Sequence, residues 1–381
     1  MISFKSKKRK EALYMGLFLT PFLFNPFTGD VEGIKTLFLS SYILLLFTVA
    51  IFNYKKTTSS NIATILSLTI GWMIITSIIH YHDFIILGAI DRYHGLLIWM
   101  ASAMIALITP FFITNISAIK KQTKALIVVS LISTIAALPL AFFIEATVFE
   151  DRIGGLTGNP NVLGKLILFV LIILGISLEQ GKSQKKTFEW IGASILFLGL
   201  IATGNRASWL GIIIVAIIYI FREKQRAIKY LLASLGIVLL LTPFLWNRIS
   251  NFTSLGTRSE IYTMAVSKIL EQPLTGYGFE FGPEVLNPDL NVPFVADRAH
   301  QLFLDIGLVM GTPGILLFLT FTVLSLKKLL RDKNSLKRSI GYALLGLFIS
   351  LQFSFFSGIS FLLYFFAIGV SLIPSSKSKK A

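Results

Sequence analysis

The chain of 381 residues is 54% hydrophobic and only 14% charged, with a mean hydropathy of +0.76. A soluble domain carries about 25% charged residues, so this composition excludes a water-soluble protein. Cysteine is absent and histidine occurs four times, which excludes disulfides, thiolate-bound zinc and a thiol nucleophile and leaves little scope for a histidine-rich metal site.

Apolar stretches that are long enough, or nearly long enough, to cross a bilayer recur along the chain. They predict an all-α, polytopic membrane protein with about twelve transmembrane helices, in a single integral membrane domain over residues 1–381. The expected spans are 12–28, 33–53, 61–80, 95–115, 124–144, 161–179, 187–203, 207–221, 229–246, 299–325, 339–356 and 359–373.

The basic residues predict which loops face the cytoplasm. With the N-terminus inside and the spans alternating, inner segments carry 26 of the 35 Lys and Arg residues and outer segments carry eight. This is the positive-inside bias, and it accounts for the net charge of +16 without a nucleic-acid partner. We therefore expect both termini in the cytoplasm. A single broken helix over 187–221 would place the basic residues that follow it outside and reverse the side of the membrane predicted for every later loop. Two spans are therefore expected there.

Residues 247–298 form one long loop between the ninth and tenth expected spans, and on this topology the loop is extracytoplasmic. Loops of this length are usually functional or disordered. The stretch SEIYTMAVSKILEQ has apolar residues at helical spacing. It predicts a short helix that lies on the membrane surface or caps a cavity.

Five outer segments hold polar residues that lipid would penalise. They are GAIDRYHG, EDRIGGLTGNPN, ATGNRASWLG, LGTRSEIY and ADRAHQLFLD, and they contain Arg92, His94, Arg152, Asn159, Asn161, Arg206, Arg258, Arg298, His300 and Asp305. An arginine at a membrane boundary can simply extend to lipid headgroups, and this explanation is open for each arginine. Arg206 fits it least, because the turn between its two flanking spans is very short.

Four arginines, Arg92, Arg152, Arg206 and Arg258, could converge at the outer mouth of the bundle. Guanidinium groups bind phosphate oxygens in pairs, so such a cluster suits a diphosphate. Lys165 lies about one turn inside the span that follows Asn161. A lysine there either faces a cavity or a partner, or extends to the outer surface; the sequence leaves both alternatives open.

His300 is the best candidate for a general base, because it lies at the outer start of a span and histidine titrates near neutral pH. An interfacial histidine with only a hydrogen-bonding role is the alternative. Glycine and proline predict tight turns at Gly154–Asn161 and at Gly276–Gly278. The Gly311–Gly314 segment predicts a kink or a close helix contact within a span.

The order of five motifs resembles the bacterial O-antigen ligase and polysaccharide polymerase superfamily, from about residue 90 to 325. The motifs are GLTGNPNVLG (155–164), TGNRASWLG (203–211), GTRSEIY (256–262), PLTGYGFEF (273–281) and AHQLFLDIGLVMGTPGILLF (299–318). Two positions depart from the family pattern. Gly-Thr-Arg stands where Gly-Arg is common, and Gln301 replaces the usual Asn after the histidine.

The resemblance implies a GT-C-like, metal-independent glycosyltransferase of the bacterial cytoplasmic (inner) membrane, with an active site that faces outside and no cofactor. Its donor would be a glycan on a polyprenyl diphosphate such as undecaprenyl diphosphate. Its acceptor would be a sugar hydroxyl, on a second lipid-linked glycan for a polymerase or on a lipid A core for a ligase. Membrane lipids would be its other partners.

The resemblance also implies roles for particular residues. Arg206 and Arg258 match the functional arginines of the family, and His300 matches its base or acceptor-orienting residue. We expect Arg92, Arg152 and Lys165 to join them at the diphosphate. The expected supporting residues are Asn159, Asn161 and Gln301, and no metal site is expected.

Two other functions remain as alternatives. A transporter or flippase of lipid-linked glycans would usually place its polar residues near the bilayer midplane and show paired repeats; here the polar residues gather at one face and no repeat is visible. A cell-wall polymerase of the shape-and-division type shares the many-helix plan, but its outer loop would carry an acidic catalytic motif that this sequence does not show.

Overall fold

The computed structural model is built almost wholly from helices, which confirms the predicted all-α class. It describes residues 6–23, 32–52, 60–83, 85–88, 94–143, 148–149, 152–180, 186–223, 253–281, 285–286 and 298–374. Its helices are α1 (Lys7–Met15), η1 (Gly16–Phe22), α2 (Glu32–Phe52), α3 (Asn61–Ile79), α4 (Leu96–Phe112), α5 (Ile116–Phe143), η3 (Gly155–Thr157), α6 (Pro160–Glu179), α7 (Lys186–Thr203), α8 (Arg206–Glu223), α10 (Thr253–Glu271), α11 (Leu302–Leu330), α12 (Ser335–Leu351) and α13 (Gly358–Leu372). A small antiparallel ribbon joins β1 (Val148–Phe149) to β2 (Arg152–Ile153).

Most helices follow the predicted apolar stretches. The expected span 12–28 differs, because α1 ends at Met15 and the chain continues as the 3-10 helix η1 to Phe22; residues 24–28 of that span lie outside the described residues. Among the described residues, four helices are long and apolar enough to cross a membrane: Gly33–Phe52, Asn61–Ile79, Pro160–Glu179 and Leu302–Leu330. Shorter apolar helices cover Leu96–Phe112, Thr187–Thr203 and Gly358–Leu372. The expected span 229–246 lies outside the described residues, so the total of about twelve spans stays a prediction. The two helices predicted around Gly204 and Asn205 are confirmed as α7 and α8.

The start of the fifth expected span also differs from the prediction. The helix expected to begin at residue 124 begins at Ile116, because Asn115 caps it by accepting a hydrogen bond from the backbone N–H of Ala118 at 2.9 Å. Lys and Gln are good helix formers, so the basic segment continues the helix. Lys121 on this extension pairs with Glu11 at 2.8 Å.

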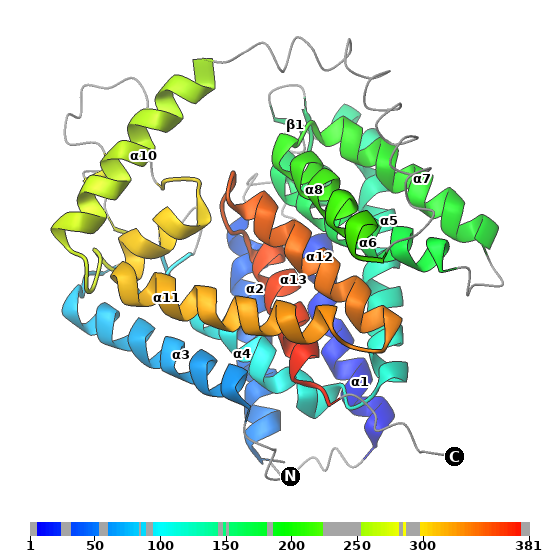
Figure 1. Cartoon of the computed structure of the whole chain (residues 1–381), viewed down its shortest axis with the longest axis horizontal. Coiled ribbons are helices and arrows are strands. Elements are labelled where there is room, and N and C mark those ends of the chain that lie inside the picture. Colours follow the sequence, from blue (N-terminus) through cyan, green and yellow to red (C-terminus); the bar gives the residue numbers. More distant parts are fainter. Residues whose placement is uncertain are drawn as a thin grey trace.

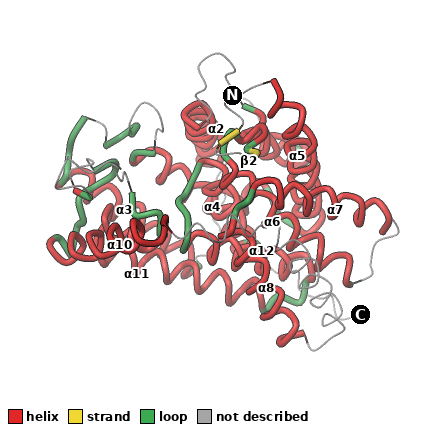
Figure 2. The backbone as a smooth tube through the Cα atoms, turned by 90° about the horizontal axis from the view of Figure 1, so that it is seen from above, coloured by secondary structure: helices red, strands yellow, loops and turns green. Residues whose placement is uncertain are grey.

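Figure 1 shows α3, α10 and α11 on one side of the molecule and α5 to α8 on the other, with α13 between them. The view from above in Figure 2 shows the same division. In α13, every residue from Gly358 to Ser371 is buried, as expected for a helix that is apolar all round and enclosed by neighbours. By contrast, only 33% of the most apolar segment of α3 is buried, whereas 78% of the corresponding segment of α6 is buried. Helix α3 therefore offers most of its surface to lipid.

The predicted kink at Gly311 is confirmed as a break within α11. Gly311 has φ +67° and ψ −170°, which is not helical. The turn that follows α10 docks into the break: Tyr277 N donates to Leu308 O at 2.6 Å, and Thr312 N donates to Pro273 O at 2.8 Å. Trp72 of α3 donates to Met310 O at 2.9 Å. Protein groups therefore satisfy backbone groups that the break would otherwise expose to lipid.

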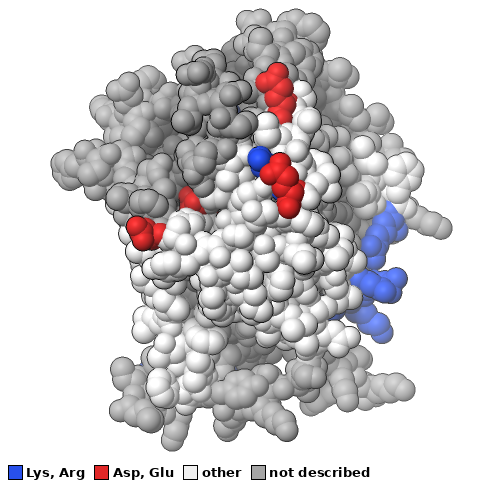
Figure 3. All heavy atoms as spheres, turned by 90° about the vertical axis from the view of Figure 1, so that its left-hand side faces the viewer, with Lys and Arg blue, Asp and Glu red and all other residues white. Residues whose placement is uncertain are grey.

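Contacts between the loops agree with the predicted alternation of spans. Residues predicted on the inner side contact one another: Lys121 with Glu11, Tyr219 with Glu179 at 2.7 Å, and Lys337 with Asp332 at 3.3 Å. Residues predicted on the outer side likewise hydrogen-bond to one another: Lys35 donates to Leu156 O at 2.6 Å, and Gln301 donates to Gln352 at 2.9 Å. The surface in Figure 3 is largely uncharged between its acidic and basic side chains, as a lipid-facing surface requires.

Single-cysteine labelling tests which end of the bundle faces outside. The chain has no cysteine of its own, and Ser267 of α10 and Lys333 between α11 and α12 are both exposed. In cells with an accessible outer face, we expect a membrane-impermeant maleimide to label Ser267→Cys. It should label Lys333→Cys only after permeabilisation. Labelling of Lys333→Cys in intact cells would reverse the topology.

Candidate functional site

The turn before α6 is fixed against the start of α8. Asn159 caps α6, since its side chain accepts a hydrogen bond from Asn161 N at 2.8 Å. The amide of Asn205 donates to Asn161 O at 2.9 Å. At Gly164 an added Cβ would lie 2.7 Å from Asn205, so the glycine permits this close approach. Two predicted outer motifs, 155–164 and 203–211, are thus neighbours, and the two predicted supporting asparagines build the turn between them.

Arg206 is the first residue of α8 and its side chain is exposed. The helix itself begins through Asn205, which accepts a hydrogen bond from Ser208 N at 3.1 Å. A cation in the first turn is not stabilised by the helix dipole, which favours anions there. Arg206 therefore adds little to the stability of α8, and its guanidinium is available to a ligand.

Phe355, in the link between α12 and α13, gathers three basic side chains. Lys165 donates to the carbonyl of Phe355 and lies 4.7 Å from its ring centroid, while Arg298 lies 5.1 Å from the same centroid. The ring of His300 packs edge-on against it at 5.4 Å. Lys165 is fully buried. Of the two alternatives, an internal partner or extension to the outer surface, the structure therefore shows the internal partner. Cations are attracted to aromatic faces, which explains the meeting point.

The segment before α11 holds His300 in an unusual conformation. His300 has φ +56°, a left-handed value that costs a non-glycine residue about 1–3 kcal/mol. Its neighbours hold it there: Ala299 N donates to Asp305 Oδ1 at 2.7 Å, and Gln301 caps α11 by accepting from Leu304 N at 2.7 Å. Gln301 also donates to Gln352, so the longer side chain at this position ties α11 to the end of α12.

Of the remaining predicted arginines, the structure describes Arg258 and Arg152. Arg258 is exposed on α10, where its positive charge is close enough to Tyr262 to lower the pKa of the tyrosine hydroxyl. Burial raises the pKa of the Tyr262 hydroxyl, the positive charge of Arg258 lowers it, and the negative charge of Asp305 raises it further. Because Asp305 of α11 acts on Tyr262 of α10, α10 passes near the start of α11. Arg152 lies in β2, half-buried, and Arg92 lies outside the described residues. Among the described residues no contact joins Arg206 to Arg258, so their convergence stays a prediction.

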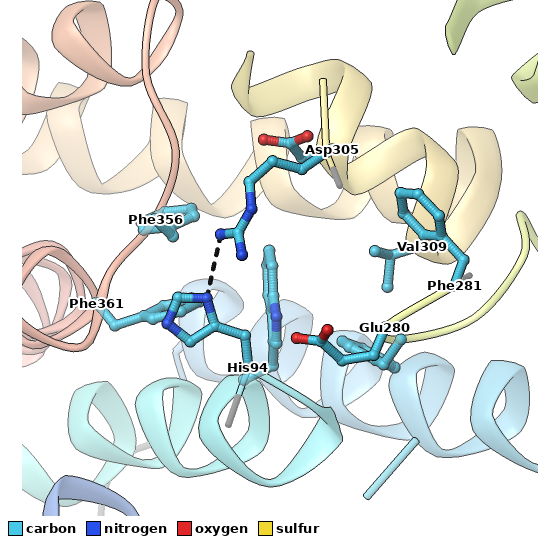
Figure 4. A pocket seen from close by; sticks show the side chains of 10 residues that line it. His94, Glu280, Phe281, Asp305, Val309, Phe356 and Phe361 are labelled. Atoms are coloured by element: carbon cyan, nitrogen blue, oxygen red, sulfur yellow. Dashed lines mark hydrogen bonds between the residues drawn. The ribbon is translucent and has the colours of Figure 1, made fainter. Parts of the chain in front are cut away.

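A half-open recess lies beside this group of basic residues. It is lined by His94, Trp99, Phe279, Glu280, Phe281, Arg298, Asp305, Val309, Phe356 and Phe361. Arg298 donates to Nδ1 of His94 at 3.1 Å and is attracted to the carboxylate of Asp305. In Figure 4 the carboxyl groups of Glu280 and Asp305 enter the recess from opposite sides.

Sequence reasoning noted His94, Arg298 and Asp305 as outer polar residues without assigning them to the site, and it missed Glu280 and Trp99. The signal for Glu280 was its place in the 273–281 motif, two residues after Gly278. His80 and His82 hydrogen-bond to this turn at Thr275 and at Phe279 O, each at 2.9 Å. Burial and the neighbouring His82 lower the pKa of His80, which favours its neutral form in this contact.

The family model described as O-antigen ligase matches residues 191–319. The match includes Arg206, Arg258 and His300, whereas the 155–164 motif and Lys165 lie outside it. No curated protein matches the chain. The match over residues 191–319 supports the resemblance of this part of the chain to the O-antigen ligase and polysaccharide polymerase superfamily.

Proposed function

We propose that the protein is a GT-C-like membrane glycosyltransferase that moves a glycan from a polyprenyl diphosphate to a sugar hydroxyl at the outer leaflet. The observation that carries the proposal is the meeting of Lys165, Arg298 and His300 around Phe355. Arg298 and His300 belong to the segment that matches the O-antigen ligase family model. The acceptor hydroxyl is on a second lipid-linked glycan in a polymerase and on a lipid A core in a ligase.

The chemistry needs an acid–base group and stabilisation of a leaving diphosphate. The acceptor oxygen forms a bond to the anomeric carbon, whose bond to the diphosphate oxygen breaks. His300 takes the proton of the acceptor hydroxyl. The diphosphate leaves with the bonding electron pair, and its negative charge is stabilised by Arg206 and the other cations, including Arg258 and Lys165.

The purified protein in detergent should join lipid-linked glycans extracted from its own cells, either to one another or to core lipid A from those cells. Mass spectrometry of the lipid and glycan products measures the transfer. A flippase would leave both substrates unchanged, since it makes no covalent bond. The break in α11 gives that alternative little support, because its backbone groups bind the 273–278 turn and are not available to a transported solute.

Transfer should persist in EDTA, because we propose that arginine and lysine side chains do the work that a metal ion does in other transferases. Among the described residues, no three side chains of His, Asp and Glu lie close enough together to hold one metal ion. The measurement is the initial rate with and without EDTA, followed by added Mg²⁺. A loss of activity that Mg²⁺ restores would contradict the metal-independent mechanism.

A further inference from the structure

We propose that the recess lined by Glu280, Asp305 and Arg298 binds the hydroxyl edge of the acceptor sugar, with Glu280 as the main hydrogen-bond acceptor for that edge. This inference rests on the proposed glycan transfer and adds to it the place of the acceptor. It assigns a binding role to a carboxylate that lies outside the group of basic residues.

The walls of the recess suit a sugar. Trp99 packs edge-on against three phenylalanines, Phe279 at 5.8 Å, Phe356 at 5.6 Å and Phe361 at 4.9 Å between ring centroids. Phe356 and Phe361 stack on each other at 4.4 Å. Ligand sites combine such apolar walls with a few placed polar groups that set orientation, and a sugar ring has both an apolar face and a polar edge.

Glu280 differs from the other polar groups of the recess in its partners. Arg298 is hydrogen-bonded to His94, and Asp305 accepts a hydrogen bond from Ala299 N. Within the described part of the chain, the carboxylate of Glu280 has no hydrogen bond or ion pair, although it is half-buried and points into the recess (Figure 4). A partly desolvated carboxylate gains most from donors that a ligand brings, and sugar hydroxyls are such donors.

The backbone at Glu280 is strained in a way that aims this side chain. Glu280 has φ +52°, and among the described residues only it and His300 are non-glycine residues with positive φ. The turn that carries Glu280 is held on both sides, since Gly278 N donates to Val309 O at 3.2 Å and His82 donates to Phe279 O at 2.9 Å. Strain of this kind persists only where the surroundings enforce it, and it gathers at functional sites.

The size of the recess limits what it holds. Its volume of ≈ 60 Å³ is room for roughly four water molecules. This is space for the hydroxyls on one edge of a sugar, not for the whole ring, which would remain at the open side. Arg298 links the recess to the base, because its guanidinium lies over Phe355, against which His300 packs. The recess is thus connected to His300 through Arg298 and Phe355.

The test is the acceptor dependence of transfer by Glu280→Gln, a change that keeps the size of the side chain and removes its charge. We expect the KM for the acceptor to rise roughly tenfold or more, as for a lost hydrogen bond to a charged group, with the KM for the lipid-linked donor unchanged. Glu260→Gln is the matched control, because Glu260 is an exposed carboxylate on α10 outside the recess; its two KM values should equal those of the natural protein.

Thermal unfolding and gel filtration in detergent show whether Glu280→Gln is folded. If it is not, Glu280→Asp supplies the same measurement, with a shortened carboxylate and the same expected rise in acceptor KM. An unchanged acceptor KM in a folded variant, or a rise in the donor KM instead, would overturn the inference while transfer by the natural protein still stands. If the natural protein forms no product from any acceptor, the proposed function itself fails.

Discussion

Arg206→Ala is expected to lower the rate of glycan transfer by about 100-fold or more, the usual effect of removing a group that stabilises charge on a leaving oxygen. Arg206 is exposed at the first position of α8, so its loss should change the free energy of unfolding by no more than about 0.5 kcal/mol. The initial rate with saturating acceptor measures the effect. Arg206→Lys should recover only part of the rate, because an ammonium group cannot form the paired contacts of a guanidinium.

Arg222→Ala is the matched control for this experiment. Arg222 lies at the opposite end of the same helix, where it donates to Leu330 O at 2.9 Å. Its loss removes one arginine from α8 without touching the proposed site, so the rate of transfer should not change. Equal rates for Arg206→Ala and the natural protein would remove Arg206 from the mechanism. A large loss in Arg222→Ala would show that the effect is not specific to the end of α8 that carries Arg206.

The second large effect is expected on stability, from Gly311→Ala. The φ of +67° and ψ of −170° at Gly311 belong to a region that is essentially restricted to glycine. An added Cβ would lie 2.5 Å from the carbonyl carbon and oxygen of Leu274, so the backbone of the docked turn would have to move. We expect a loss of about 3 kcal/mol or more in the free energy of unfolding, seen as a lower midpoint of thermal unfolding in detergent.

Two other glycines make this a specific test. An added Cβ meets nothing within 4 Å at Gly71 of α3 or at Gly175 of α6. Alanine is the better helix former, so Gly71→Ala and Gly175→Ala should be neutral or slightly stabilising. If Gly311→Ala unfolds at the same temperature as these controls, the break in α11 does not hold the turn as described.

Much of the candidate site could be found from the sequence because the clue is local. A polar residue at the end of an apolar stretch, or a lysine within one, is visible without a fold, and this pointed to Arg206, His300 and Lys165. The alternatives for Lys165 could not be separated in this way, because the carbonyl of Phe355 that accepts its hydrogen bond lies 190 residues further along the chain. Phe355 itself reads as one more apolar residue at the end of the expected span 339–356.

The sequence by itself determined the helical class, the positions of most helices and the grouping of the loops into two ends, since hydropathy and charge act over neighbouring residues. Only the tertiary structure decided that α13 is enclosed while α3 faces outward. Both are apolar throughout, and burial depends on which helices pack around them. The recess at Glu280 is likewise a tertiary product, because its lining comes from segments near residues 94–99, 279–281, 298–309 and 356–361 that only packing brings together.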